Sequence, residues 1–189
     1  MADDYNFGVR DQGSNFWGNK VGSQIGLKYI DVLGVPTLDL QVEHNRVRTY
    51  TYQHFNIAST YTNYGQSLGH SAGANLVDFH TILQYHPLPP LHLLFSYSYL
   101  MQGLDQDGFN YGADYQQPTG NRPRAEDFNY VIGDGEALQV HNLYGRLTWQ
   151  LWNLDAYLEL EGRYRLANEL QSVSILGGLR ANIVGRMIR

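Results

Sequence analysis

The chain has 189 residues, of which 13 % are aromatic and 16 % charged, a formal net charge of −5 and no cysteine. A negative charge without a basic stripe argues against a nucleic-acid binder, and the lack of cysteine excludes disulfides, thiolate zinc sites and cysteine nucleophiles. No apolar run approaches the roughly 20 residues of a membrane helix, but the alternating strands of a membrane barrel escape that test.

Apolar and polar residues alternate with a period of two, which predicts β-strands that each have one apolar and one polar face. In residues 143–151, for example, Leu143 and Leu147 alternate with Tyr144 and Arg146. The predicted strands, in chain order, are 23–30, 37–52, 75–85, 91–101, 143–151, 156–166 and 172–184. Because no amphipathic helix of normal length is visible, we predict an all-β fold.

The lengths of the connections between the predicted strands indicate which kind of β-structure the strands form. Residues 31–36, 86–90 and 152–154 are short connections, and 167–171 is a moderate one. The long segments 1–22, 53–74 and 102–137 all fall at one end of the sheet. Short periplasmic turns and long extracellular loops are typical of outer-membrane barrels. We therefore predict an antiparallel up-and-down transmembrane β-barrel in the bacterial outer membrane, with these three long segments outside the cell.

About seven strands do not complete such a barrel. Intact bacterial barrels have an even number of strands, and an open sheet edge is not viable in lipid. The acidic N-terminus also lacks the basic start and apolar core of a signal peptide. We therefore expect residues 1–189 to be the C-terminal part of a single, larger barrel domain.

The placement of charge favours a barrel over a β-sandwich. In six of the seven predicted strands the apolar face carries no charge, as a lipid face requires, because a charge at mid-membrane costs roughly 2–4 kcal/mol. The polar faces carry the residues predicted to face the lumen: Lys28, Asp39, Glu43, Glu159, Glu161, Arg163, Arg165 and Arg180. A sandwich remains the alternative fold, since alternation alone is shared by both.

Three local patterns suggest chemistry. Residues 69–73 match G-x-S-x-G, the nucleophile elbow of α/β-hydrolases, with Ser71 as nucleophile. A polar segment precedes the match instead of a buried strand. Four histidines follow it, and three of them come too early for the Ser-acid-His order, so an esterase is not favoured. Residues 105–108 resemble the start of a calcium loop but lack its closing Glu, and a turn is the commoner meaning. The scattered histidines do not predict a metal site, and no cofactor is expected.

The long 103–137 segment is rich in tyrosine and amide side chains. Aromatic platforms beside amides suit carbohydrate binding through stacking and hydrogen bonds, whereas a partly ordered surface loop is the alternative. The candidate ligand-binding residues are Asn110, Tyr111, Tyr115 and Asn121.

Residues 64–75 read Tyr-Gly-Gln-Ser-Leu-Gly-His-Ser-Ala-Gly-Ala-Asn. This segment resembles the Wzi-like capsule-assembly barrels and, more closely, the RemB gliding-motility proteins of Bacteroidetes. Further similar segments occur in order at 18–22, 27–30, 38–48, 102–105, 108–112 and 178–182. The resemblance implies that Gly69, His70, Gly73 and Asn75 are loop-shaping or loop-function positions.

The resemblance also implies a non-enzymatic outer-membrane protein that takes part in capsule polysaccharide attachment or in gliding motility and adhesion. Its expected partners are outer-membrane lipid and lipopolysaccharide, surface polysaccharide and other gliding or surface-assembly proteins. Two departures are that the family's N-terminal half is absent and that the chain ends without the usual terminal aromatic. An outer-membrane diffusion channel or transporter is the alternative function, and the Ser71 esterase is the third.

Overall fold

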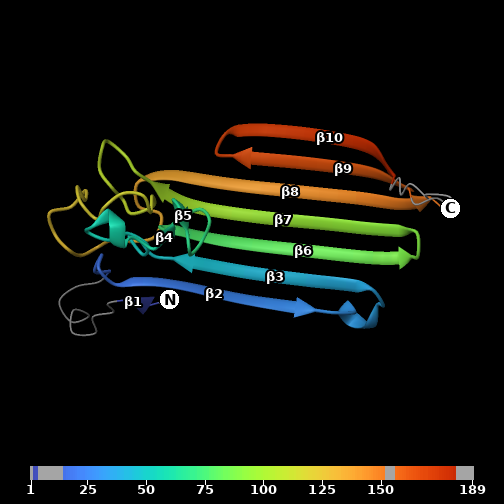
Figure 1. Cartoon of the computed structure of the whole chain (residues 1–189), viewed down its shortest axis with the longest axis horizontal. Helices are drawn as coiled ribbons and strands as arrows, with labels where there is room; N and C mark the ends of the chain where they lie inside the picture. The colour runs from blue at the N-terminus through green and yellow to red at the C-terminus, as the bar shows by residue number, and fades with distance from the viewer. Residues whose placement is uncertain (1, 4–14, 152–155, 182–189) are drawn as a thin grey trace, which may run out of the picture. The chain divides into compact units, whose positions relative to one another are not determined.

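The computed structural model of the chain describes residues 2–3, 15–151 and 156–181. These residues form one open sheet of eight antiparallel strands in the order β1-β2-β3-β6-β7-β8-β9-β10 (Figure 1). The strands are β1 Ala2–Asp3, β2 Lys20–Tyr29, β3 Leu38–Val47, β6 Leu76–Leu88, β7 Leu91–Leu104, β8 Glu136–Leu151, β9 Ala156–Ala167 and β10 Leu170–Ala181. The predicted all-β class and the seven long strands are confirmed, whereas no pairing between described residues closes the sheet into a barrel.

Smaller elements lie in the connections. The hairpin of β4 (Thr62–Asn63) and β5 (Gln66–Ser67) forms a separate sheet, and the 3-10 turns are η2 (Val32–Gly34) and η3 (Ile57–Ser59). No helix in the described part of the chain is long and apolar enough to cross a membrane.

The chain divides into two compact units. Unit 1 comprises Met1–Ile25, His44–Phe79 and Tyr99–Gln139, and unit 2 comprises Gly26–Glu43, His80–Ser98 and Val140–Arg189. Unit 1 holds the two longest connections, and unit 2 holds β9, β10 and most of β8. Loop residues therefore dominate unit 1, and strand residues dominate unit 2.

The predicted strand 37–52 was too long, because β3 ends at Val47. Beyond it Tyr50 adopts a left-handed backbone with φ 60°, and its N–H donates to the carbonyl of Gly112 at 3.1 Å instead of to a strand.

The predicted long connection 102–137 was also too long, because β7 reaches Leu104 and β8 begins at Glu136. The connection between β9 and β10 is a tight turn at Asn168, whose φ is 49°. The predicted turn 152–154, residues 182–184 and most of segment 1–22 lie outside the described residues.

Unit 1 contains two groups of buried side chains, which come from its loops and from the adjoining strand ends. Val47, Tyr52, Ala74 and Leu76 form a buried apolar cluster. A second group centres on Tyr50, whose ring meets Trp17 and Tyr130 edge-on at centroid distances of 5.8 and 5.6 Å. Such edge-to-face pairs add to the stabilisation that burial of the rings provides. The long connections are therefore folded structure and not loose surface loops.

In unit 2 the register of β8, β9 and β10 aligns their apolar residues in rows across the sheet. The rows are Leu143–Tyr164–Val173, Gly145–Gly162–Ile175, Leu147–Leu160–Gly177, Trp149–Leu158–Leu179 and Leu151–Ala156–Ala181. None of these positions carries a charge, so one face of the three strands is continuously apolar.

On β8 from Leu143 to Leu151, and on β9 from Leu158 to Glu161, the apolar face is more exposed than the polar face. On β9, Leu158 and Leu160 are 47 % and 52 % exposed, whereas Glu159 and Glu161 between them are half-buried. A half-buried sheet in water has the opposite arrangement, with apolar residues inside and polar residues outside. Large contiguous apolar patches are rare on soluble monomers. The exposure of these β8 and β9 side chains is therefore the reverse of that expected for a sheet with one face in water.

Candidate functional site

The motif at 64–75 lies in unit 1, where its glycines fit under other segments. A Cβ on Gly69 would collide with the Tyr52 ring, and a Cβ on Gly73 would collide with the carbonyl oxygen of Ala113. Gly73 also has φ 87°, in the left-handed region that favours glycine. Both positions therefore shape the loop through close backbone approach.

Gly73 can be tested against a neighbouring glycine. Gly65 has a similar φ of 74°, but nothing lies within 4 Å of the position that a Cβ would take there. We expect Gly65→Ala to cost about 1–2 kcal/mol from the left-handed backbone alone, and Gly73→Ala about 3–5 kcal/mol because the collision with Ala113 adds to it. Denaturant unfolding of the two variants measures the difference, and equal costs would contradict the close approach.

His70 is held by three hydrogen bonds. Its Nδ1 accepts from the Ala72 N–H at 3.2 Å, so Nε2 carries the proton and donates to Oδ2 of Asp78 at 2.7 Å. The backbone N–H of His70 donates to the Tyr52 hydroxyl at 3.0 Å. Asp78 is itself buried at the start of β6. This pair ties the motif loop to a strand.

The pair also bears on the esterase alternative. Ser71 is exposed, and the adjacent imidazole has both ring nitrogens engaged, one with Ala72 and one with Asp78. A serine nucleophile needs a base whose nitrogen is free to take its proton. His70 does not offer that nitrogen in this arrangement.

Asn75 joins several distant segments of unit 1. It is fully buried, and its Nδ2 donates to the carbonyls of Gly103, Asp134 and Tyr111 at 2.7, 2.8 and 3.3 Å. Its Oδ1 accepts from the Gly133 N–H at 2.8 Å. Its backbone N–H donates to Arg48, and its carbonyl accepts from Gly103. A single side chain thus connects β6, the end of β7 and the segment before β8.

Of the candidate ligand-binding residues, Asn110 is committed to internal bonds. Its side-chain amide pairs with that of Gln53 in both directions, at 3.1 and 3.2 Å. It also donates to the carbonyl of Pro118 and accepts from the Gly112 N–H. Only 3 % of the surface of Asn110 is exposed. Its side chain therefore holds segments of the loop together.

The other three candidates are spread over unit 1. The carbonyl of Tyr111 accepts from Asn75, and Tyr115 packs against the cluster around Val47. Asn121 is exposed, and its side chain donates to the carbonyl of Gly108. Tyr115 and Tyr111 are partly exposed, so ligand binding by these residues stays a prediction.

Residues 105–108 form a turn. Asp107 and Gly108 have φ 53° and 77°, and Gln106 and Phe109 form an isolated bridge across them. The carboxylate of Asp105 accepts from the Tyr111 N–H at 2.8 Å and from the Gln117 amide at 3.0 Å. In the described part of the chain no group of three or more metal-ligating side chains comes together.

A group of cation–aromatic contacts in unit 1 was not predicted from the sequence. Arg122 lies 4.1 Å from the centre of the Trp17 ring, and both side chains bond to Asp127. Arg124 pairs with Asp134 at 2.8 Å, a hydrogen bond that raises the pKa of Arg124. Trp17 and Asp127 are 110 positions apart, so no local spacing could reveal them.

The buried Tyr50 predicts a pH dependence. Its hydroxyl donates to the carbonyl of Asn110 at 2.6 Å, and desolvation by burial, followed by the nearby Tyr130, raises the pKa of Tyr50 far above its usual range. Above the unfolded pKa of about 10, the unfolded chain loses this proton while the folded chain keeps it, so stability falls as pH rises. We expect Tyr50→Phe to flatten that decline, measured by denaturant unfolding between neutral and alkaline pH. An unchanged slope would contradict the assignment.

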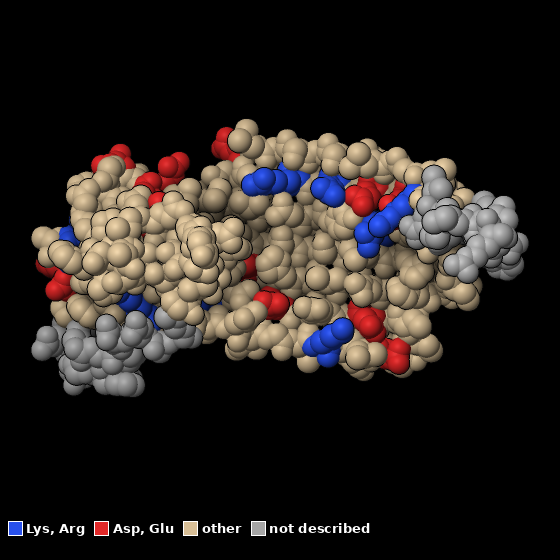
Figure 2. Space-filling view, viewed as in Figure 1, with Lys and Arg blue, Asp and Glu red and all other residues tan. Residues whose placement is uncertain are grey.

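In unit 2 the residues predicted to face the lumen share the polar face of β8–β10. Figure 2 shows acidic and basic side chains side by side over these strands. Arg163 pairs with Glu161 at 3.1 Å and lies 5.2 Å from the centre of the Tyr144 ring. The register places Arg146 opposite Glu161, and Arg165 opposite Asn142. The structure therefore brings together on one surface five of the residues that were predicted to face the lumen: Glu159, Glu161, Arg163, Arg165 and Arg180.

The three remaining residues of that prediction lie on β2 and β3. Asp39 and Glu43 are both half-buried, and Lys28 is exposed. Asp39 accepts from the N–H of Asp31 at 3.3 Å, so it also supports the turn before β3.

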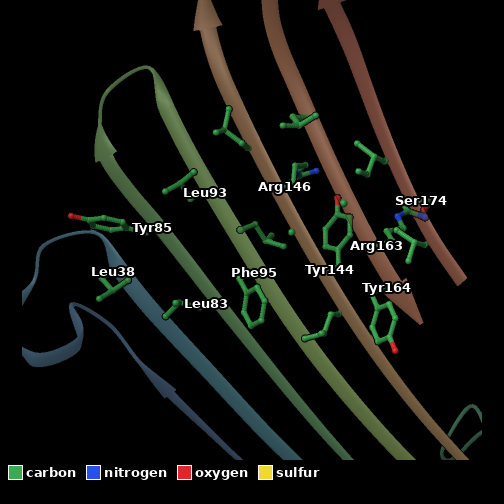
Figure 3. A pocket seen from close by; sticks show the side chains of 18 residues that line it. Leu38, Leu83, Tyr85, Leu93, Phe95, Tyr144, Arg146, Arg163, Tyr164 and Ser174 are labelled. Atoms are coloured by element: carbon green, nitrogen blue, oxygen red, sulfur yellow. The ribbon is translucent and has the colours of Figure 1, made fainter. Parts of the chain in front are cut away.

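A depression of about 710 Å³ lies along unit 2, with side chains from six strands (Figure 3). Its lining includes Gly145 and Gly162, which face each other in one row. Nothing lies within 4 Å of the position that a Cβ would take on either glycine. Because rows with the large side chains of Leu143 and Leu147 flank the glycine row, the missing side chains create the hollow.

A scan against protein-family models, a search of curated proteins and a search of solved structures found no match.

Proposed function

We propose that the sheet is part of the wall of a bacterial outer-membrane β-barrel, with its apolar face toward lipid and its polar face toward the interior. The observation that supports this most strongly is the reversed exposure on β8 and β9. Leu147 and Leu160 are 38 % and 52 % exposed, whereas Arg146 and Glu161, on the other face, are half-buried. Lipid stabilises an apolar outer face, and a polar interior is typical of these barrels.

The dimensions support the same proposal. The apolar rows run from Leu143 to Leu151 on β8, about the 9–11 residues that a tilted membrane strand needs. Tyr164 lies in the first row and Trp149 in the fourth. Separated by about 20 Å along the strands, they suit the two aromatic girdles of a barrel.

The open edge supports a larger barrel. Every residue of β10 is exposed, from Leu170 to Ala181, and the described strands do not supply a second neighbour for it. An unpaired edge is not tolerated in lipid. In our proposal further strands, beyond those described, complete the ring.

The proposed role is non-enzymatic: attachment of surface polysaccharide such as capsule, or gliding motility and adhesion. It rests on the resemblance of the 64–75 segment and on the folded, tyrosine- and amide-rich connections between β3 and β6 and between β7 and β8. Because these connections follow the ends of alternate antiparallel strands, they leave the sheet at the same end, as extracellular loops do.

The first test uses the complete gene that encodes this chain. Outer membranes are isolated and the protein is run on SDS gels with and without boiling, because closed barrels resist SDS until heated. We expect membrane fractionation and a boil-dependent mobility shift. A protein that stays in the soluble fraction without a shift would contradict the barrel.

The second test addresses the role. A strain that lacks the gene is compared with its parent for cell-bound and released polysaccharide and for spreading on agar. We expect released polysaccharide to rise or spreading to fall. If both are unchanged while purified protein conducts ions in planar bilayers, the diffusion-channel alternative replaces the proposal.

A further inference from the structure

A second depression, of about 350 Å³, lies on the polar face of unit 2. It is lined by His92, Arg146, Thr148, Tyr157, Glu159 and Arg180. Its shape follows from the strand register. Thr148, Glu159 and Gly178 form one row, and the row of Gln150, Tyr157 and Arg180 lies beside it. Nothing lies within 4 Å of the position that a Cβ would take on Gly178, so this glycine leaves the hollow open.

Positive charge predominates around this hollow. Two arginines line it, against the single carboxylate of Glu159. Neither Arg146 nor Arg180 forms a side-chain hydrogen bond or ion pair with a residue that the structure describes. Glu161, which the register places opposite Arg146, is paired with Arg163 at 3.1 Å. Arg146 interacts with Glu161 only through the attraction of their charges. Within the described ranges, no hydrogen bond or ion pair of Arg146 or Arg180 would therefore compete with a ligand.

The positions of these groups suit a sugar ligand. Arg146 and Arg180 lie on β8 and β10, two strands and four residues of register apart, which corresponds to about 16 Å between their Cα atoms. Thr148 lies between them in the register, and Tyr157 lies in the row of Arg180 on the intervening strand β9. Both side chains offer a hydroxyl group. Arginine binds carboxylate and phosphate oxygens through two parallel hydrogen bonds.

We propose that this hollow binds the anionic group, carboxylate or phosphate, of an acidic saccharide. The inference rests on the proposed function, since it names the class of polysaccharide that the barrel would handle.

The test measures binding of oligosaccharides to the full-length protein in detergent at low salt, by calorimetry. The probe is an oligosaccharide of alternating glucuronate and N-acetylglucosamine, and its carboxyl-reduced form is the neutral comparison. We expect the acidic form to bind at least about tenfold more tightly, as two charge-assisted contacts imply. Equal affinity for the two forms would overturn the proposal.

Variants then locate the site. Arg146→Gln with Arg180→Gln should reduce acidic binding to the neutral level. Arg165→Gln removes an arginine from the same face but outside the hollow, so it should leave the affinity within about twofold. Glu159→Gln removes the repelling carboxylate and should tighten binding about threefold. The higher affinity expected of Glu159→Gln keeps the test informative if the arginine variants fold poorly. A lower affinity of Glu159→Gln would overturn the proposal.

Two controls separate the possible outcomes. Competition by inorganic phosphate stronger than that by free glucuronate identifies phosphate as the preferred anionic group, and the reverse identifies carboxylate. The boil-dependent gel shift on the same preparation reports the barrel separately. A shifted protein without acidic selectivity refutes only the saccharide site, whereas an unshifted one refutes the barrel itself.

Discussion

Leu147→Arg is expected to destabilise the folded protein by about 2–4 kcal/mol, whereas Thr148→Arg, one residue along β8, should cost less than about 1 kcal/mol. Leu147 lies in the middle row of the apolar face and is 38 % exposed. If that exposed surface meets lipid, the new charge must be desolvated or pull in water. Thr148 points to the polar face, where a charge stays hydrated. Denaturant unfolding in lipid vesicles, followed by tryptophan fluorescence, measures both costs.

The matched pair also distinguishes the two candidate folds. In a β-sandwich, the apolar face would pack on another sheet. Leu147→Arg would then destabilise the protein in plain buffer, without vesicles or detergent, because the arginine would collide with that sheet and its charge would be buried. A sheet whose Leu147 simply faces water would tolerate both substitutions within about 0.5 kcal/mol. Only a lipid-facing position makes the Leu147→Arg penalty appear in vesicles together with loss of membrane insertion.

Asn75→Ala is expected to cost roughly 3–5 kcal/mol and to loosen all of unit 1. The substitution leaves the Gly133 N–H and the carbonyls of Gly103 and Asp134 without their buried partner. Each orphaned buried group costs about 1–3 kcal/mol. Alanine is also strained at the Asn75 φ of 58°. Unfolding in denaturant gives the total, and hydrogen exchange at Gly103 and Gly133 locates it.

Asn75→Gly is the matched control, because glycine accepts the left-handed backbone but lacks the amide. We expect it to recover only about 1 kcal/mol of the Asn75→Ala loss. Full recovery would mean that backbone strain, and not the hydrogen-bond network, is what Asn75 supplies.

The strands could be predicted from the sequence because their signal is local. Alternation in 143–151 and 156–166 reflects a polar and an apolar face on each strand, and β8 and β9 contain these segments. The same local signal predicted which charges share a face, including Glu159 and Arg163. It failed at the end of β3, where the predicted strand ran on to residue 52. The face of Leu38 already becomes polar at Arg46 and Arg48, and the backbone turns at Tyr50.

The loop structure could not be predicted in the same way, because its contacts join distant residues. Gln53 and Asn110 form their amide pair across 57 positions, and each residue alone is an ordinary polar residue. We expected Asn110 to contact a ligand because it is an amide beside tyrosines in the sequence, but its side chain bonds to Gln53 within the loop. Asn75 was singled out only by the family resemblance, and Gly73 by that resemblance and by the G-x-S-x-G match. Their geometry supplies a physical reason for both residue types.

The Asn75 network has a consequence for the order of folding. The hairpin of β9 and β10 pairs residues that start three positions apart, Leu170 with Ala167, so it can form as soon as both strands exist. The bonds of Asn75 span 28 to 59 positions, and such long loops close slowly. We therefore expect unit 1 to become rigid last. Its contacts would stabilise strands whose pairing was already established.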